Sequence, residues 1–164
     1  MFWRALTAVS LTIMPVLTQA QTGADSVAIV EAAARWYASQ VPANSRVGFV
    51  LPRAPRSGPA PTPGQFEAAQ HGARVLRATL IPYDSLTAKL CDRKKTGDCG
   101  PGKFDFGVEV HVIRITGNAS EVSVIQSTTG PGPRLRHGVR EWTILIVRSG
   151  DGWAFDRILG TSAS

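Results

Sequence analysis

Apolar and polar residues alternate most regularly in the C-terminal third of the chain, as they do in a strand with one buried face. The alternation covers residues 105–112, 121–128 and 141–147, and it resumes at residues 153–159 after a tight glycine-rich turn. Because turns or loops separate consecutive runs, the pattern predicts an antiparallel meander. Its buried face is expected to carry Phe106, Val108, Val110, Val112, Val122, Val124, Trp142, Ile144 and Ile146.

An amphipathic helix is predicted near the N-terminus, over residues 26–40. Asp25 or Ser26 would be its cap, and Pro42 lies beyond its end. Apolar residues recur there at helical spacing, so they share one face of the helix. We expect this face to pack on the sheet; it consists of Val27, Val30, Ala34, Tyr37 and Val41.

A short strand is predicted at residues 46–51, and a proline-rich segment follows it. Five prolines occur in residues 52–63, which favours an extended, solvated connection. We interpret this segment as a loop inside one domain, because the chain before it is too short to bury a core alone. A linker between two domains is the alternative.

A second, short helix is predicted over residues 63–71. Thr62 and Gln65 match a capping box, with a proline at the first helical position between them. Gly72 stands where this helix would end, and residues 74–81 are expected to form a brief strand.

This order of elements predicts the α+β class. Helices come early in the chain and adjacent strands come last, so we expect the N-terminal amphipathic helix and the short second helix to pack on a curved, mainly antiparallel sheet. With 164 residues, the chain has the size of one domain. An apolar share of 43% argues against disorder, and no apolar run reaches the roughly 18 residues that a membrane-spanning helix needs.

Residues 1–20 have the pattern of a signal peptide. Arg4 precedes an apolar stretch at residues 5–17, and Thr18 and Ala20 supply the small residues at the −3 and −1 positions of a cleavage site. We therefore expect export to the periplasm or the extracellular space, cleavage after Ala20, and a single mature domain over residues 21–164. A buried N-terminal helix is the alternative, but Pro15 would fit poorly inside it.

The chain has two cysteines, Cys91 and Cys99, and they enclose a short polar loop. In an oxidising compartment a lone, closely spaced pair is expected to form a disulfide, which here would close the loop of residues 91–99. Metal ligation would need further ligands nearby, and redox motifs usually have the tighter Cys-x-x-Cys spacing.

The last hairpin suggests a family. Residues 141–158 read EWTILIVRSGDGWAFDRI, which resembles the final hairpin of the cone-shaped nuclear-transport-factor-two-like (cystatin-like) superfamily, where a turn with a Gly-Trp pair also leads into the last strand. The resemblance covers the C-terminal third and the placing of the N-terminal helix. It implies a pocket between helix and sheet. Enzymes of that superfamily resemble ketosteroid isomerases and dehydratases with an Asp or His inside the cone, but no such motif matches here.

Glu109 and His111 are the strongest candidates for acid–base chemistry. They lie two positions apart and so share a strand face, where a carboxylate can orient an imidazole. The simpler interpretation, which we favour, is a polar pair on the solvated face of the sheet. His71 is interpreted as a polar residue near a helix end. The chain has no phosphate-binding loop, dinucleotide glycine pattern, serine-nucleophile elbow or zinc-ligand spacing, so we predict no cofactor and no metal site.

Basic residues form a candidate anion-binding cluster before the Trp142 strand: Arg134, Arg136, His137 and Arg140. A second basic group, residues 93–95, lies in the cysteine loop. The alternative is a solubilising spread of charge without a ligand. Nucleic acid is a poor match, because no aromatic residues are interleaved with these positions to stack on bases.

No motif assigns an activity. The leading hypothesis is a non-enzymatic exported domain that binds a small apolar or anionic ligand or a cell-envelope component. The first alternative is a small cone-fold enzyme of isomerase or hydrolase type that uses His111, Glu109 or an unidentified Asp. The second is an interaction module that uses an open sheet surface or the proline-rich loop.

Overall fold

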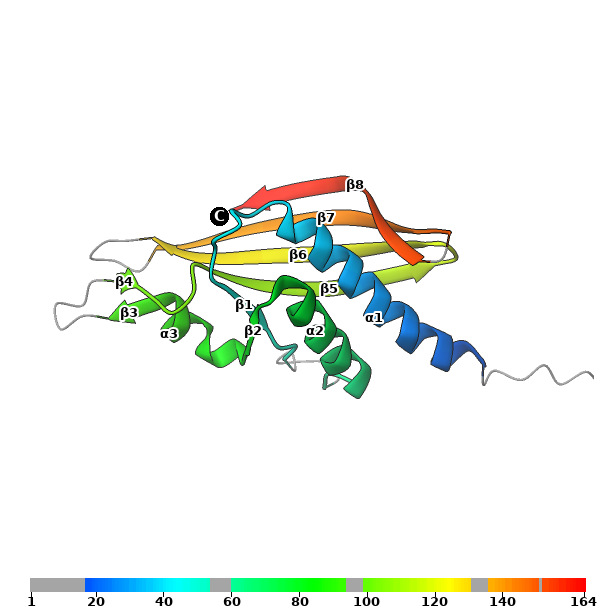
Figure 1. The fold of residues 1–164 in the computed structure, drawn as a ribbon, viewed down its shortest axis with the longest axis horizontal. Coiled ribbons are helices and arrows are strands. Elements are labelled where there is room, and N and C mark those ends of the chain that lie inside the picture. Colours follow the sequence, from blue (N-terminus) through cyan, green and yellow to red (C-terminus); the bar gives the residue numbers. More distant parts are fainter. Residues whose placement is uncertain (1–16, 54–59, 94–98, 131–135, 151) are drawn as a thin grey trace, which may run out of the picture.

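The computed structural model describes residues 17–53, 60–93, 99–130, 136–150 and 152–164, without the side chains of residues 17–22, 92–93, 99–101, 130 and 136–137. Within these residues six strands form one sheet in the order β2-β1-β5-β6-β7-β8, while β3 and β4 pair separately (Figure 1). Strand β1 runs parallel to β2 and β5, and β5 to β8 are antiparallel, which confirms the predicted α+β class. The helices are α1 (Leu17–Ala38), α2 (Pro63–Leu76) and α3 (Leu86–Leu90), with a 3-10 turn at Tyr83–Ser85. The strands are β1 (Val47–Val50), β2 (Thr79–Ile81), β3 (Cys91–Arg93), β4 (Cys99–Pro101), β5 (Phe106–Thr116), β6 (Ala119–Gly130), β7 (Arg136–Ser149) and β8 (Gly152–Ala163).

The main core lies between the sheet and the helices α1 and α2, which cover one face of it (Figure 1). The predicted apolar face of the meander is the buried one: Val108, Val122, Val124, Ile144 and Ile146 are fully inaccessible, and Val110 and Val112 are half-buried. Each aliphatic side chain buried in this way stabilises the fold by roughly 1.5–3 kcal/mol. Helix α1 contributes Ile29, Val30, Ala32, Ala33, Trp36 and Tyr37 to this core.

Helix α1 begins earlier than its predicted cap and ends slightly sooner. The helix starts at Leu17 rather than at residue 25 or 26, and it ends at Ala38 rather than at residue 40. Asp25 does not cap it, because its carboxylate accepts hydrogen bonds from Arg148 and from the indole N–H of Trp153. Asp25, which the sequence predicts to be a helix cap, therefore holds α1 against the β7–β8 hairpin.

The capping box of α2 is confirmed, but its predicted end is wrong. The Gln65 N–H donates to the Thr62 hydroxyl at 3.3 Å, and the Gln65 side chain accepts from the Thr62 N–H at 2.8 Å. The helix continues through Gly72 to Leu76 and ends at Arg77, which has a left-handed φ of 51°. The strand expected from residue 74 is consequently only β2, at Thr79–Ile81.

A smaller core lies on the opposite face of the sheet. Phe49 and Val50 are consecutive in β1, and they point into the main core and the smaller core respectively. The smaller core consists of Val50, Ile81, Leu86, Leu90 and Phe104. The sheet is thus covered by α1 and α2 on one side and, near β1, by α3 on the other.

The two cysteines lie in the separate hairpin. Cys91 begins β3 and Cys99 begins β4, and the antiparallel register pairs Arg93 with Cys99 and Cys91 with Pro101. The backbone therefore brings both cysteines onto adjacent strands. The side chain of Cys99 lies outside the described side chains, so the Cys91–Cys99 disulfide stays a prediction.

Arg46 and Asp105 join the first residues of the β1–β5 pair. The Arg46 backbone N–H donates to Asp105 Oδ2 at 2.7 Å, and its Nη2 donates to Oδ1 at 2.6 Å. The hydrogen bonds from the Arg46 side chain and backbone hold the pKa of Asp105 below its ordinary value. Both side chains are substantially exposed, so solvent screens the charges and the ion pair itself contributes little to stability.

Gly72 lies where α2 comes closest to its neighbours. A Cβ at this position would be 2.8 Å from the Phe49 ring and 2.9 Å from Val30, and both of these side chains are buried. At Gly64, in the first turn of the same helix, the nearest atom to an added Cβ would be 3.9 Å away. Gly72 is therefore required for helix packing, and it does not mark a helix end.

Gly72→Ala is expected to lower the free energy of unfolding by about 1–3 kcal/mol, because the added methyl group overpacks the core. Gly64→Ala is the matched control, and it should leave stability equal or raise it by up to about 1 kcal/mol through helix propensity. Urea denaturation followed by circular dichroism measures both. Equal stability of the two variants would contradict the close packing described for Gly72.

Candidate functional site

A pocket of about 320 Å³ opens between α1, α2, the end of β1 and the middle of β5. Its apolar wall combines residues that are far apart in the sequence, because each of these elements contributes one or two apolar side chains. Most of this wall is buried, which gives the pocket a firm apolar floor. The wall is made by Val30, Phe49, Ala68, Ala69, Val110 and Val112.

Polar groups line the rest of the pocket: Ser26, Thr62, Gln65, Glu109 and His111. Thr62 and Gln65 are present because they form the cap of α2, whose first turn lines the pocket. Glu109 and His111 reach it from β5. Strand β1 pairs with β5 only as far as Val108, so in the described part of the chain no strand pairs with the next residues of β5 on this side.

Glu109 and His111 form a pair, as their shared strand face predicts. His111 Nε2 lies 3.3 Å from Glu109 Oε2. The Glu109 side chain is 14% exposed, whereas the His111 side chain is 47% exposed. The carboxylate can therefore orient the imidazole, but the imidazole is open to water on the sheet face that lies away from the main core.

Ser123 is a neighbour of this pair that sequence analysis did not identify. It is buried and lies directly opposite His111 in the β5–β6 register. Its hydroxyl donates to Glu141 Oε1 at 2.6 Å, so it is not engaged with the imidazole as a nucleophile would be. Only the strand register could reveal this neighbour, because residues 111 and 123 have no common local pattern. Among the described residues no group of three or more His, Cys, Asp or Glu could hold a metal ion.

The predicted anion-binding cluster lies mostly outside the described residues. Arg134 is outside them, as are the side chains of Arg136 and His137 at the start of β7. Arg140 is described and exposed, with its guanidinium 5.6 Å from the centre of the Trp142 ring. It borders a second hollow of about 340 Å³ beside the C-terminal residue Ser164. An anion site here stays a prediction.

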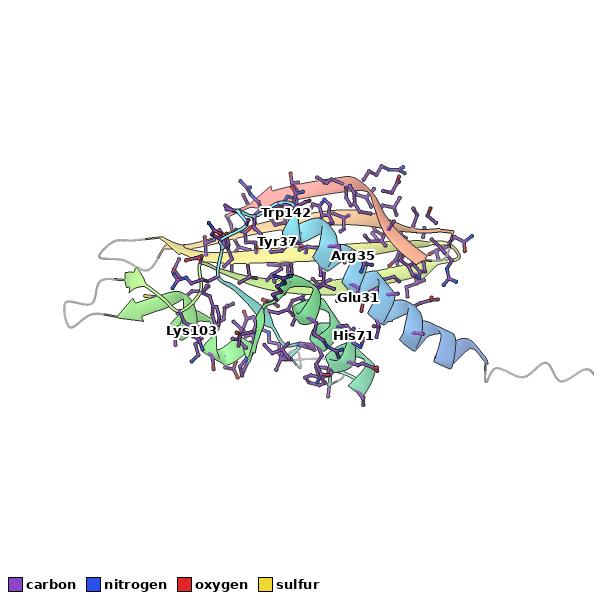
Figure 2. The ribbon with its side chains drawn as sticks, in the orientation of Figure 1. Glu31, Arg35, Tyr37, His71, Lys103 and Trp142 are labelled. Atoms are coloured by element: carbon purple, nitrogen blue, oxygen red, sulfur yellow. The ribbon has the colours of Figure 1, made fainter. Side chains whose placement is uncertain are left out.

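His71 belongs to the interior of α2 and not to a helix end, since α2 is longer than predicted. Its Nδ1 lies 2.7 Å from Glu31 Oε1 on α1, and Arg35 lies 3.6 Å from the other oxygen of the same carboxylate. Figure 2 shows these side chains where the two helices meet. The group joins α1 to α2, and none of its residues lines the pocket.

Tyr37 carries a buried hydroxyl that makes no hydrogen bond within the described part of the chain. The residue is fully inaccessible, and its ring packs edge-on against Trp142 with centres 6.1 Å apart (Figure 2). Burial raises the pKa of the Tyr37 phenol well above its ordinary value. Because the phenol lines no described pocket, we assign it to the core and not to a functional site.

Comparison with known proteins adds no assignment: no family model matches the chain, and no curated protein or solved structure matches it. In the described residues no helix has the length and apolar character needed to cross a membrane.

Tyr37→Phe is expected to leave the free energy of unfolding unchanged or raise it by about 1 kcal/mol, because the unpaired hydroxyl is costly to bury. Tyr37→Ala, the control, should lower it by about 3–5 kcal/mol because it removes the ring from the core. Chemical denaturation monitored by tryptophan fluorescence measures both. A Tyr37→Phe variant much less stable than the parent would show that the hydroxyl has a partner.

Proposed function

We propose that the mature chain is an exported, non-enzymatic binding domain that holds a small ligand in the pocket between α1, α2 and β5. The observation that carries the proposal is the composition of this pocket. It combines an apolar wall with a few polar groups at one side, which is the usual character of a small-molecule site.

The lining also indicates the ligand's chemistry. The Glu109 carboxylate is the least exposed charged group of the pocket, and an anion placed beside it would be repelled. A ligand without negative charge, with an apolar body and hydrogen-bonding groups, fits better. Arg140, which could attract an anion, belongs to a different hollow.

Membership in the nuclear-transport-factor-two-like superfamily is part of the proposal. It is supported by a pocket between helices and sheet and by a final hairpin that packs against α1. In this hairpin Trp153 donates a hydrogen bond to Asp25, and Phe155 stacks on Trp36. The parallel pairing of β1 with β5 departs from a simple antiparallel cone.

The enzyme alternative is favoured by one observation, the Glu109–His111 contact at the pocket wall. It requires a reacting group beside an imidazole that faces water. A ligand that is chemically converted when bound would support this alternative over simple binding.

Export predicts a mature protein that starts at Gln21. Cleavage after Ala20 would remove residues 17–20 from the start of α1 but would keep Asp25 and its contacts with the β7–β8 hairpin. Intact-mass spectrometry of the product secreted by an expressing cell should report this N-terminus, and reduction should add the mass of two hydrogens for the Cys91–Cys99 bond. Retention of residues 1–20 would contradict export, and an unchanged mass on reduction would contradict the disulfide.

Val112→Trp is expected to block the pocket, because Val112 is half-buried in its wall. Ile113→Trp is the matched control: Ile113 is the next residue of β5, is 54% exposed and does not line the pocket. Ligand-observed NMR with a library of uncharged fragments should find ligands whose affinity falls at least about tenfold in the first variant only. Ligands that bind both variants equally would place the site elsewhere. Ligands recovered after binding should be chemically unchanged, because a binding domain does not convert them.

A further inference from the structure

The edge of β5 is only partly covered. Strand β5 has 11 residues, but β1 pairs with only the first three of them, Phe106 to Val108, and β1 itself ends at Val50. Among the described residues no other strand pairs with this edge (Figure 1). Residues 109–112, which directly follow the β1 pairing, form one wall of the pocket.

The backbone of this edge presents free hydrogen-bonding groups to the pocket. The Arg148 N–H donates to the Asn118 carbonyl, so the even-numbered residues of β6 hydrogen-bond to β7 and the odd-numbered ones to β5. The β5–β6 register places these odd-numbered residues opposite Gly107, Glu109 and His111, so the N–H of Val108 points away from β6, toward β1. Successive N–H groups of a strand alternate in direction, so those of Val110 and Val112 point to the same side. There they meet no strand within the described residues, and an unpaired backbone group is a template for another strand.

We propose that the pocket binds an extended peptide segment of a partner protein, which adds to the sheet beside residues 109–112 of β5 in line with β1. This proposal rests on the proposed binding function and names the class of its ligand. Main-chain hydrogen bonds would provide affinity, and the alternating side chains of the peptide would provide specificity.

The two sides of the edge dictate the chemistry of the segment. Side chains of the peptide that point inward would contact Phe49 and Ala69, so they should be apolar. Side chains that point outward would lie beside the Glu109 carboxylate, so they should be basic. The partner segment therefore alternates apolar and basic residues.

The other long edge of the sheet is less suited to strand addition. Strand β8 has two irregularities in its pairing with β7, at Thr143/Ile144 and at Leu145/Ile146, and such bulges disrupt a regular edge. The first part of the β5 edge is regular, and its bulge comes only after Val112. The regular part is short and borders the pocket that α1 and α2 also line, which fits a short extended segment.

A synthetic peptide with alternating Lys and Val residues is the probe, and the same peptide with Glu in place of Lys is its matched control. Fluorescence anisotropy with the exported, mature protein measures affinity. We expect the Lys peptide to bind at least about threefold more tightly. General electrostatic attraction predicts the reverse order, because the chain has a net charge of +6.

Backbone pairing is tested from both partners. Val112→Pro removes the N–H that faces the pocket without removing one that faces β6. It should weaken binding of the Lys peptide at least about tenfold. The midpoint of its urea denaturation verifies that the variant is folded. On the peptide, N-methylation of all Val or of all Lys residues blocks one edge only. One methylated peptide should therefore lose binding and the other keep it, independently of any protein variant.

Equal binding of the Lys and Glu peptides, or equal loss with both methylated peptides, would overturn the proposal. So would a homodimer, seen by sedimentation, that Val112→Pro dissociates, because the edge would then belong to a second copy. If the peptide does not bind but fragments bind the parent protein and lose affinity in Val112→Trp, the proposed function stands. Failure of both would remove the binding function itself.

Discussion

The apolar face of the β5–β8 meander has to be covered, and the packing of α1 on it is the constraint from which the other contacts follow. Trp36 packs edge-on against Trp142 with ring centres 5.7 Å apart and stacks on Phe155 at 5.4 Å, so one side chain joins α1 to both β7 and β8. Once α1 is placed, small residues let α2 lie beside it: Ala68, Ala69, Gly72 and Ala73 are its buried positions. The closeness of these two helices determines the floor of the pocket.

The pocket exists because this cover is incomplete. Strand β1 ends at Val50, and Thr62 at the cap of α2 is one of the residues that line the pocket beyond this end. An apolar wall and an unpaired strand edge therefore meet in one place, beside Glu109. The proposed small ligand and the proposed peptide strand would both occupy this place, where the edge of β5 has no hydrogen-bonding strand among the described residues.

Local chemistry explains which predictions succeeded. The Thr62–Gln65 capping box and the alternation around Val108 depend on neighbours in the sequence, so they could be recognised before the fold was known. The roles predicted for Asp25 and Gly72 were wrong because each residue type has two uses. An Asp can cap a helix or accept tertiary hydrogen bonds, and a Gly can end a helix or admit a close neighbour, and only packing distinguishes them.

By itself the sequence determined the α+β class, the buried face of the meander, the start of α2 and the contact between Glu109 and His111, because all of these follow from spacing along one element. Tertiary structure alone decided the length of α1 and α2, the pairing of His71 with Glu31, the position of Ser123 and the open edge of β5. Each of these features depends on which distant segments come together. Burial and strand register determine that, and no local sequence pattern encodes them.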